Sequence, residues 1–418
     1  MLSRIRIKWQ SSLLLKKMLF TLGIVFIYMV GRAIPISTIP LDTEAIKNTT
    51  LKSALNNLAS VTGGQLSTMT LFSLGLSPVM TSMILWRFLT VFELFKNYTN
   101  AQVYRFRMYL ALFIGLIQAF GYTASLNFLE VEGSLFTGDG LLRLVTVLIL
   151  IGGSFVLAWL GNMNTEKGIG GPTVIIIVNM LLSLFQSAEQ LFKNGDFSML
   201  TYWGIVILAI LAINALILVT IITHRAEYRI PIRRISVSNT YTEENYIPIR
   251  LNPAGGMPFM YGMTLMMLPP LIIQGLQGLF PKEKFLETLY NQIGLSNWPG
   301  VIIYAIILYL LAIGFTYYNY DPVDITKNMR RGGDYIEHVR PGKETERFIR
   351  KRLTIFAHIG AIFICLIGVG PLFLTIGKSD MTGIALFVSN IFIITSLMIS
   401  IIEQIDMLLT WKKYGKLL

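Results

Sequence analysis

The side chains best suited to catalysis or metal binding are few and lie far apart in this chain. Its three histidines are His224, His338 and His358, and its one cysteine, Cys365, lies inside an apolar run. A metal site or a nucleophile with its base needs such groups close together. No HExxH, GxSxG or phosphate-binding loop occurs either. We therefore expect no catalytic residue, no metal site, no cofactor and no disulfide framework.

Hydroxyl side chains are the one polar group with a clear pattern, and they concentrate in the segment 63–87. This segment reads GGQLSTMTLFSLGLSPVMTSMILWR, which is long enough to cross a bilayer but too polar to face lipid. Its hydroxyls are Ser67, Thr68, Thr70, Ser73, Ser77, Thr81 and Ser82. Either the segment is a tightly packed central helix, whose hydroxyls bond to the preceding turn, or it lines an aqueous path through the membrane.

The composition places this segment in a membrane protein. Hydrophobic residues make up 54% of the 418 residues and charged residues only 14%, with a mean hydropathy of +0.62. The basic N-terminus resembles a signal peptide, but the apolar run continues to Val30 without a small-x-small cleavage site, so it predicts a retained span. No charged residue lies near the middle of any apolar segment, which argues against an ion-coupled transporter or an intramembrane metalloenzyme.

Ten segments are long and apolar enough to span a bilayer. They are 13–31, 66–86, 106–125, 142–161, 172–191, 201–222, 256–275, 300–319, 353–374 and 383–402. An even number puts both termini on one side. Placing that side in the cytoplasm puts 27 of the 35 Lys and Arg inside, so the chain is predicted to be an all-α polytopic membrane protein, N-in and C-in.

Two of the expected cytoplasmic loops are long and basic. The loop 223–251 contains two runs that alternate apolar and polar residues around a Ser-Asn-Thr turn, and this pattern predicts a small two-stranded ribbon. The loop 320–352 is rich in both charges and ends in a charged helix. Such loops can simply follow the positive-inside rule or contact anionic lipid. Their length, regular structure and clustered arginines favour a platform for a protein partner.

On the outer side, the segment 49–61 predicts a short amphipathic helix. Leu51, Leu55 and Leu58 recur at helical spacing, and Gly63 and Gly64 follow as a flexible stop. Burial of three leucines is worth only about 5 kcal/mol before ordering costs. The segment is therefore either a plain surface helix or a docked element that can be displaced.

Four motifs in this order and spacing resemble the SecY family, the channel subunit of the protein-conducting Sec translocon. They are Gly63 to Ser67 with Phe72 to Pro78, the turn Thr165 to Gly170, the entry Leu251 to Gly255 to the seventh span, and Ile336 to Gly342. The resemblance covers nearly the whole chain. It implies two pseudo-symmetric halves of five spans, 1–195 and 196–418, related by an inverted repeat and opening beside the second and seventh spans.

Carried over position by position, the resemblance also implies a pore. Its narrowest part would be an apolar ring that excludes ions by dewetting. The ring positions are Leu76, Met80, Ile177, Leu181, Met260 and Met398. The segment of about 49–64 would be the plug that closes the pore from outside, although Lys52, Ser53, Asn56 and Asn57 make it more polar than is usual in the family.

The same resemblance implies partners. The two basic loops match those that receive a SecA-type motor or a ribosome, through Arg233, Arg234, Arg330, Arg331, Arg340 and Lys343. The other implied partners are small SecE-like and SecG-like membrane subunits, an unfolded secretory polypeptide and the lipid bilayer. The resemblance implies no direct contact between this chain and nucleic acid. Short outer loops, the polar plug and the methionines of the ring are more similar to the accessory SecY paralogue of Gram-positive bacteria, which exports serine-rich glycoprotein adhesins across the plasma membrane.

Three other interpretations stay open at this point. One is the housekeeping SecY of general secretion and membrane insertion, which the chain resembles less closely than the accessory form. A small-molecule secondary transporter has the same inverted-repeat logic but would work without a motor. A scaffold that only anchors cytosolic partners would keep partner binding when the pore is blocked.

Overall fold

The protein is a bundle of long helices, several of them apolar enough to cross a membrane. The structure, a computed structural model, describes residues 13–36, 70–91, 98–124, 139–193, 199–234, 245–279, 284–295, 297–376 and 382–414. Within these ranges the helices are α2 (Leu13–Ala33), α4 (Ser77–Val91), α5 (Asn100–Ala124), α6 (Asp139–Lys167), α7 (Pro172–Lys193), α8 (Met199–Arg225), α9 (Met257–Leu279), α10 (Lys284–Ile293), α11 (Trp298–Asn319), α12 (Pro322–Gly332), α13 (Lys343–Leu374) and α14 (Thr382–Tyr414). Helices satisfy all their backbone groups internally, which is why an apolar chain adopts them in lipid.

Seven helices in the described ranges are long and apolar enough to cross a membrane, so the chain is a multi-pass membrane protein. They lie in α2, α5, α6, α9, α11, α13 and α14. Shorter apolar stretches occupy parts of α7 and α8. Each of the ten expected spans overlaps one of these nine helices or α4. The count of ten membrane crossings and the side of the membrane on which each terminus lies stay predictions.

The expected span 66–86 is wrong at its beginning. The helix α4 starts only at Ser77, and residues 71–76 form turns in which Gly75 has a φ of 59°. A left-handed residue interrupts a right-handed helix, and Pro78 suits the first turn because its missing N–H needs no partner there. Thr70 pairs with Pro35, which follows α2, through an isolated antiparallel bridge.

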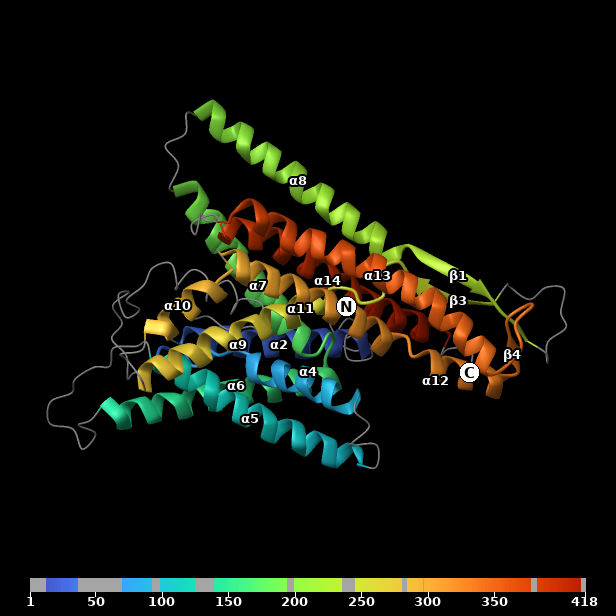
Figure 1. Cartoon of the computed structure of the whole chain (residues 1–418), viewed down its shortest axis with the longest axis horizontal. Helices are drawn as coiled ribbons and strands as arrows, with labels where there is room; N and C mark the ends of the chain where they lie inside the picture. The colour runs from blue at the N-terminus through green and yellow to red at the C-terminus, as the bar shows by residue number, and fades with distance from the viewer. Residues whose placement is uncertain are drawn as a thin grey trace, which may run out of the picture.

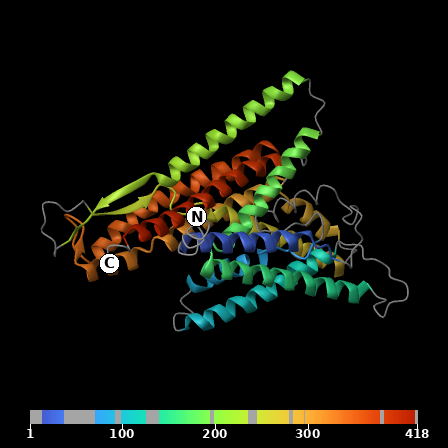
Figure 2. The ribbon, with the colours of Figure 1, turned by 180° about the vertical axis from the view of Figure 1, so that it is seen from behind.

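The helices run roughly along one common direction, with α5 at one edge of the bundle and α8 at the opposite edge (Figure 1). Between these edges, α5 packs on both α4 and α9. Gly121 of α5 lies against the backbone carbonyl of Leu271 in α9, so the two helices approach as closely as backbones allow. On the reverse side, α2 and α6 lie side by side (Figure 2).

Two small sheets extend beyond one end of the bundle (Figure 1). Strand β1 (Glu227–Pro231) pairs antiparallel with β3 (Tyr246–Arg250), which confirms the ribbon expected in the first basic loop. Strand β2 (Arg233–Arg234) pairs with β4 (Asp334–Tyr335) of the second basic loop. The second pairing was not expected, and it joins the two loops into one structure.

Candidate functional site

The hydroxyl residues of α4 and the turn before it are packed inside the protein. Ser73, Ser77, Thr81 and Ser82 are fully buried. The Thr81 hydroxyl donates to the Ser77 carbonyl at 2.8 Å, and the Ser82 hydroxyl donates to the Val79 carbonyl at 2.8 Å. This is the local bonding by which a hydroxyl is accommodated in an apolar interior. The geometry favours a tightly packed central helix over a helix whose hydroxyls face water.

Four of the six expected ring residues lie in the main apolar core. Leu76 precedes α4, Met80 lies in α4, Ile177 in α7 and Met260 in α9, and all four are buried. Leu181 of α7 and Met398 of α14 differ, since 40% and 44% of their surfaces are exposed. The four helices contact one another in the order α4, α9, α14, α7. The structure thus brings the ring-bearing helices together, and the ring itself stays a prediction.

The expected plug lies outside the described residues. This applies to Leu51, Leu55, Leu58, Gly63 and Gly64. Its identity and its position stay predictions.

The two basic loops fold around a small apolar core of their own. This second core is separate from the main one and gathers side chains from β1, β3, α12, the residue after β4, and α13. Its buried members are Ile230, Ile249, Met329, Ile336, Ile349 and Leu353. We call the unit formed by β1 to β3, α12, β4 and the first turns of α13 the platform.

Aromatic side chains tie the ribbon of the platform to α13. Tyr228 of β1 packs on Phe356, with ring centroids 5.4 Å apart, and the Arg352 guanidinium lies over the Tyr228 ring at 5.9 Å. Such cation–π contacts add to the burial of the rings themselves. The platform is therefore fixed to a membrane helix, and its position follows that of α13.

The expected docking residues lie in this platform. Arg330 and Arg331 end α12, while Arg340 and Lys343 flank the start of α13, and all four are exposed. Arg233 is also exposed and forms an ion pair with Glu337 at 2.6 Å, and Arg234 pairs through β2 with Asp334. The pairing of β2 with β4 brings the two arginine groups into one structure, which the sequence spacing alone did not show.

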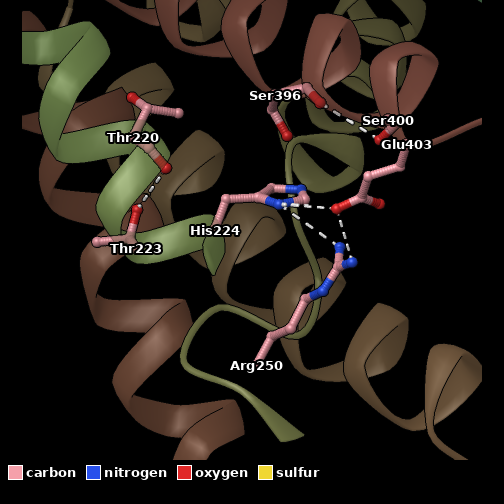
Figure 3. Close-up of polar contacts among 7 residues, drawn as sticks. All are labelled: Thr220, Thr223, His224, Arg250, Ser396, Ser400 and Glu403. Carbon is pink, nitrogen blue, oxygen red and sulfur yellow. Dashed lines mark hydrogen bonds and ion pairs between the residues drawn. The ribbon is translucent and has the colours of Figure 1, made fainter. Parts of the chain in front are cut away.

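A polar cluster that the sequence did not predict joins α8, β3 and α14 (Figure 3). The Arg250 guanidinium donates to Glu403 Oε1 at 2.8 Å and lies 3.5 Å from His224 Nδ1. His224 Nδ1 is 3.9 Å from Glu403 Oε1, and its side chain is only 6% exposed. These residues are far apart in the chain, so no spacing pattern could have revealed the cluster.

The pKa of His224 reflects this environment. His224 lies past the end of the expected span 201–222, in the last turn of α8. Burial lowers its pKa below the ordinary value of 6.5, the Arg250 charge lowers it further, and the Glu403 charge raises it in part. A neutral ring next to Arg250 accepts a hydrogen bond from the guanidinium and avoids placing a buried positive charge beside it.

The remaining histidines lie elsewhere in the structure. Among the described residues, no group of three or more His, Cys, Asp or Glu side chains is placed to hold a metal ion. His358 contacts the Tyr309 hydroxyl at 2.8 Å through Nδ1, on adjacent helices α13 and α11. His338 is exposed in the platform.

Comparison with known proteins identifies the family. The SecY family model matches residues 70–407. The accessory Sec system protein translocase subunit SecY2 of Streptococcus parasanguinis is 45% identical over 100% of both chains. The protein of the same name from Leuconostoc gelidum subsp. gasicomitatum is 36% identical and covers 97% of both chains.

Solved structures agree on the fold. One described as a protein conducting channel matches 96% of this chain and 93% of its own, with a TM-score of 0.67 at 16% identity. Sec61 from the canine ribosome-channel complex matches the same shares with a TM-score of 0.64. The fold is therefore that of the SecY and Sec61 channels, and the chain belongs to the SecY family.

Proposed function

We propose that this protein is the channel subunit of an accessory Sec translocon, which passes unfolded secretory polypeptides across the bacterial plasma membrane. The observation that carries the proposal is the folded basic platform at one end of a SecY-type helix bundle. Full-length similarity to accessory SecY2 subunits supports the accessory pathway over the housekeeping one. Serine-rich glycoprotein adhesins are the proposed cargo.

The platform is the proposed seat of a SecA-type motor. Its arginines belong to a unit with its own apolar core. A partner that binds them therefore contacts a folded unit, so its motion can be transmitted to α13. The guanidinium of Arg340 can form a forked bond to a partner carboxylate, which a lysine cannot do. This role places the platform, both termini and the basic loops in the cytoplasm.

The helix bundle is the proposed conduit. We assign 1–195 and 196–418 to two halves, the six ring positions to the waist of the pore and the segment of about 49–64 to its plug. Buried Met80 and Met260 suit a ring that deforms around a passing chain, because methionine is flexible and forms no specific bond. SecE-like and SecG-like subunits are the proposed membrane partners. No step requires catalysis by this chain.

Transport into vesicles tests the function directly. Vesicles containing this subunit and its small partners, with a SecA-type motor and ATP, should import an unfolded serine-rich secretory chain. Replacing Arg340 with Glu reverses the charge at an exposed position of the platform, just before α13. We expect at least about a tenfold loss of import, since a repelled docking contact costs several kcal/mol.

A matched charge reversal serves as the control. Lys327→Glu changes an exposed lysine of α12 that lies outside the proposed docking set and pairs with Asp324 at 3.7 Å. Import should remain near the parental level in this variant. Parental import with Arg340→Glu would remove that residue from the docking site, and uptake of small solutes without motor or ATP would favour a secondary transporter instead.

A further inference from the structure

One short stretch of α14, residues 396–404, receives contacts from four segments, three between residues 224 and 256 and one in the distant turn between α6 and α7. These segments are the last turn of α8, the end of β3, the turn between α6 and α7, and the turn before α9. Figure 3 shows two of them, with the side chains of His224 and Arg250 both directed at Glu403. The stretch is therefore one place at which the platform meets the membrane bundle, in addition to α13.

On the platform side, the contact is ionic. Arg250 is the last residue of β3, and its bond of 2.8 Å to Glu403 fixes the base of the ribbon to α14. The backbone N–H of Leu251 donates to the Ala226 carbonyl at 2.8 Å, so the two ends of the ribbon are held together at the same point. Movement of the ribbon must then act on α14 through Glu403.

On the opposite side, the contact is a hydrogen bond from the turn 168–171. The backbone N–H of Gly170 donates to Gln404 Oε1 at 2.9 Å. Gly170 has a φ of 76°, and a Cβ there would come within 3.2 Å of the Ile401 side chain. Only glycine allows this turn to approach α14 so closely.

The turn 168–171 is itself rigid. The Asn164 amide donates to the carbonyls of Ile169 and Gly171 at 2.9 and 2.8 Å. The Ile169 N–H donates to the Thr21 hydroxyl of α2 at 2.9 Å. A displacement of Gln404 should therefore move α2 and α6 together with the turn, because the turn is bonded to both helices.

The turn before α9 packs on the same stretch. Gly255 has a φ of 64°, and a Cβ on Gly256 would meet the Ser396 side chain at 2.8 Å. The Asn319 amide at the end of α11 donates to the Pro253 carbonyl at 2.9 Å. The start of α9 is therefore held against α14 as well, about two helical turns from Glu403.

We propose that Glu403 and Gln404 are positioning residues that form a two-sided clasp, in which Glu403 holds Arg250 of the platform and Gln404 holds Gly170 of the α6–α7 turn. The clasp keeps the platform and the α2–α6 side of the bundle in one fixed arrangement. Because adjacent residues of one helix make the two contacts, a partner that displaces the ribbon also displaces the turn. That this displacement opens the channel rests on the proposed function, whereas the existence of the clasp does not.

Distance measurements between two spin labels test the clasp without any transport. In a Cys365→Ala background, labels at Glu166→Cys, at the exposed end of α6, and at Asn245→Cys, beside β3, report the separation across the clasp. A second pair, Lys327→Cys and Asn245→Cys, reports distances within the platform alone. We expect Glu403→Gln and Gln404→Leu each to increase about threefold the fraction of molecules in which the labels at residues 166 and 245 lie farther apart than in the parent. A threefold change is what the loss of one partly exposed polar contact should produce.

Matched variants keep the test specific. Asp406→Asn removes another acidic side chain of α14, which is exposed, and should leave both distances unchanged. Gln404→Glu retains an acceptor for the Gly170 N–H and should restore the parental distance, as should the charge exchange Arg250→Glu with Glu403→Arg. An unchanged distance across the clasp in both Glu403→Gln and Gln404→Leu overturns the proposal, and so does an equal change within the platform pair.

Transport then separates the two proposals. If the clasp governs the channel, Glu403→Gln should change motor-driven import while binding of the motor to the vesicles stays parental. A change in label distance without any import by the parent protein would contradict the proposed function and leave the clasp intact. Parental import in a variant whose label distance has changed would show that the clasp does not control opening.

Discussion

The main core and the platform hold together by different interactions, although both are organised around buried apolar side chains. In the main core, α5 and α9 are in backbone contact at Gly121 and Leu271, and the buried hydroxyl of Thr81 donates to a carbonyl of its own helix. In the platform, six buried side chains are surrounded by exposed charges, with ion pairs such as Arg233 to Glu337 at its surface. Close packing of helices stabilises the main core, whereas the platform has only a small apolar core and a charged surface.

This difference indicates how each region responds to change. Dispersion contacts and backbone packing do not depend on salt or pH, so the main core should be insensitive to both. Exposed ion pairs are screened by salt, and the protonation of a buried histidine such as His224 depends on pH. The clasp at Glu403 and Gln404 lies where the two regions join, and it combines an ion pair with a hydrogen bond from the backbone.

The largest effect is expected from overpacking the main core. Gly121→Val adds a Cβ that would clash with the Leu271 carbonyl, and backbone cannot move aside as a flexible side chain would. We expect a loss of at least about 3 kcal/mol in stability or a failure to fold. Thermal unfolding of the purified protein in detergent measures it.

A glycine on α6 provides the control for that variant. A Cβ on Gly152 meets nothing within 4 Å, so Gly152→Ala should unfold at the parental temperature or slightly above. Equal stability of Gly121→Val and the parent would contradict the close packing of α5 on α9.

A smaller and more local effect is expected in the platform. Ile249→Ala removes a side chain that is 1% exposed in the second core, which should cost about 2 kcal/mol because the surrounding side chains can partly collapse. Hydrogen exchange should accelerate in β1 and β3 and remain unchanged in α9. Asn245→Ala, at an exposed position beside β3, should leave all three unchanged, and faster exchange in α9 would show that the two cores are one unit.

The smallest effect concerns pH at the clasp. Burial and Arg250 lower the pKa of His224, with Arg225 adding to the decrease and Glu403 opposing it. When the clasp opens and His224 reaches solvent, its pKa returns toward 6.5 and it binds a proton more readily than in the closed clasp. The clasp should therefore be fully formed above pH 6.5 and should weaken as the pH falls below it. The label distance across the clasp should therefore increase between pH of about 7.5 and about 5.5, and His224→Asn should abolish this dependence. A dependence that survives in His224→Asn would assign the titration to another group.

Much of the fold could be predicted because it follows from local patterns. Length and hydropathy located ten apolar segments, each of which overlaps a helix, and alternation of side chains located the ribbon of β1 and β3. The late start of α4 was missed although the sequence contains its signal, the pair Ser77-Pro78 after Gly75. Helix-start residues within an apolar run are easily outweighed by hydropathy.

The contacts between distant segments could not be predicted in the same way. Strands β2 and β4 have two residues each, too few for any periodicity, and they pair across about a hundred positions of sequence. His224, Arg250 and Glu403 are ordinary residues until the fold brings them together. Ring and plug positions came from family resemblance, and burial alone does not distinguish a pore-lining methionine such as Met260 from one that simply packs.

Crosslinking to a stalled substrate tests the central claim, that a polypeptide passes through this bundle. A photoreactive residue at positions 76, 80, 177 and 260 should crosslink a secretory chain halted during motor-driven import, whereas one at Phe113, which is exposed on α5, should not. Crosslinks that require both motor and ATP and are confined to those four positions are the predicted result. Crosslinks at Phe113 alone, or none at any position during active import, would contradict a path through the bundle and the ring within it.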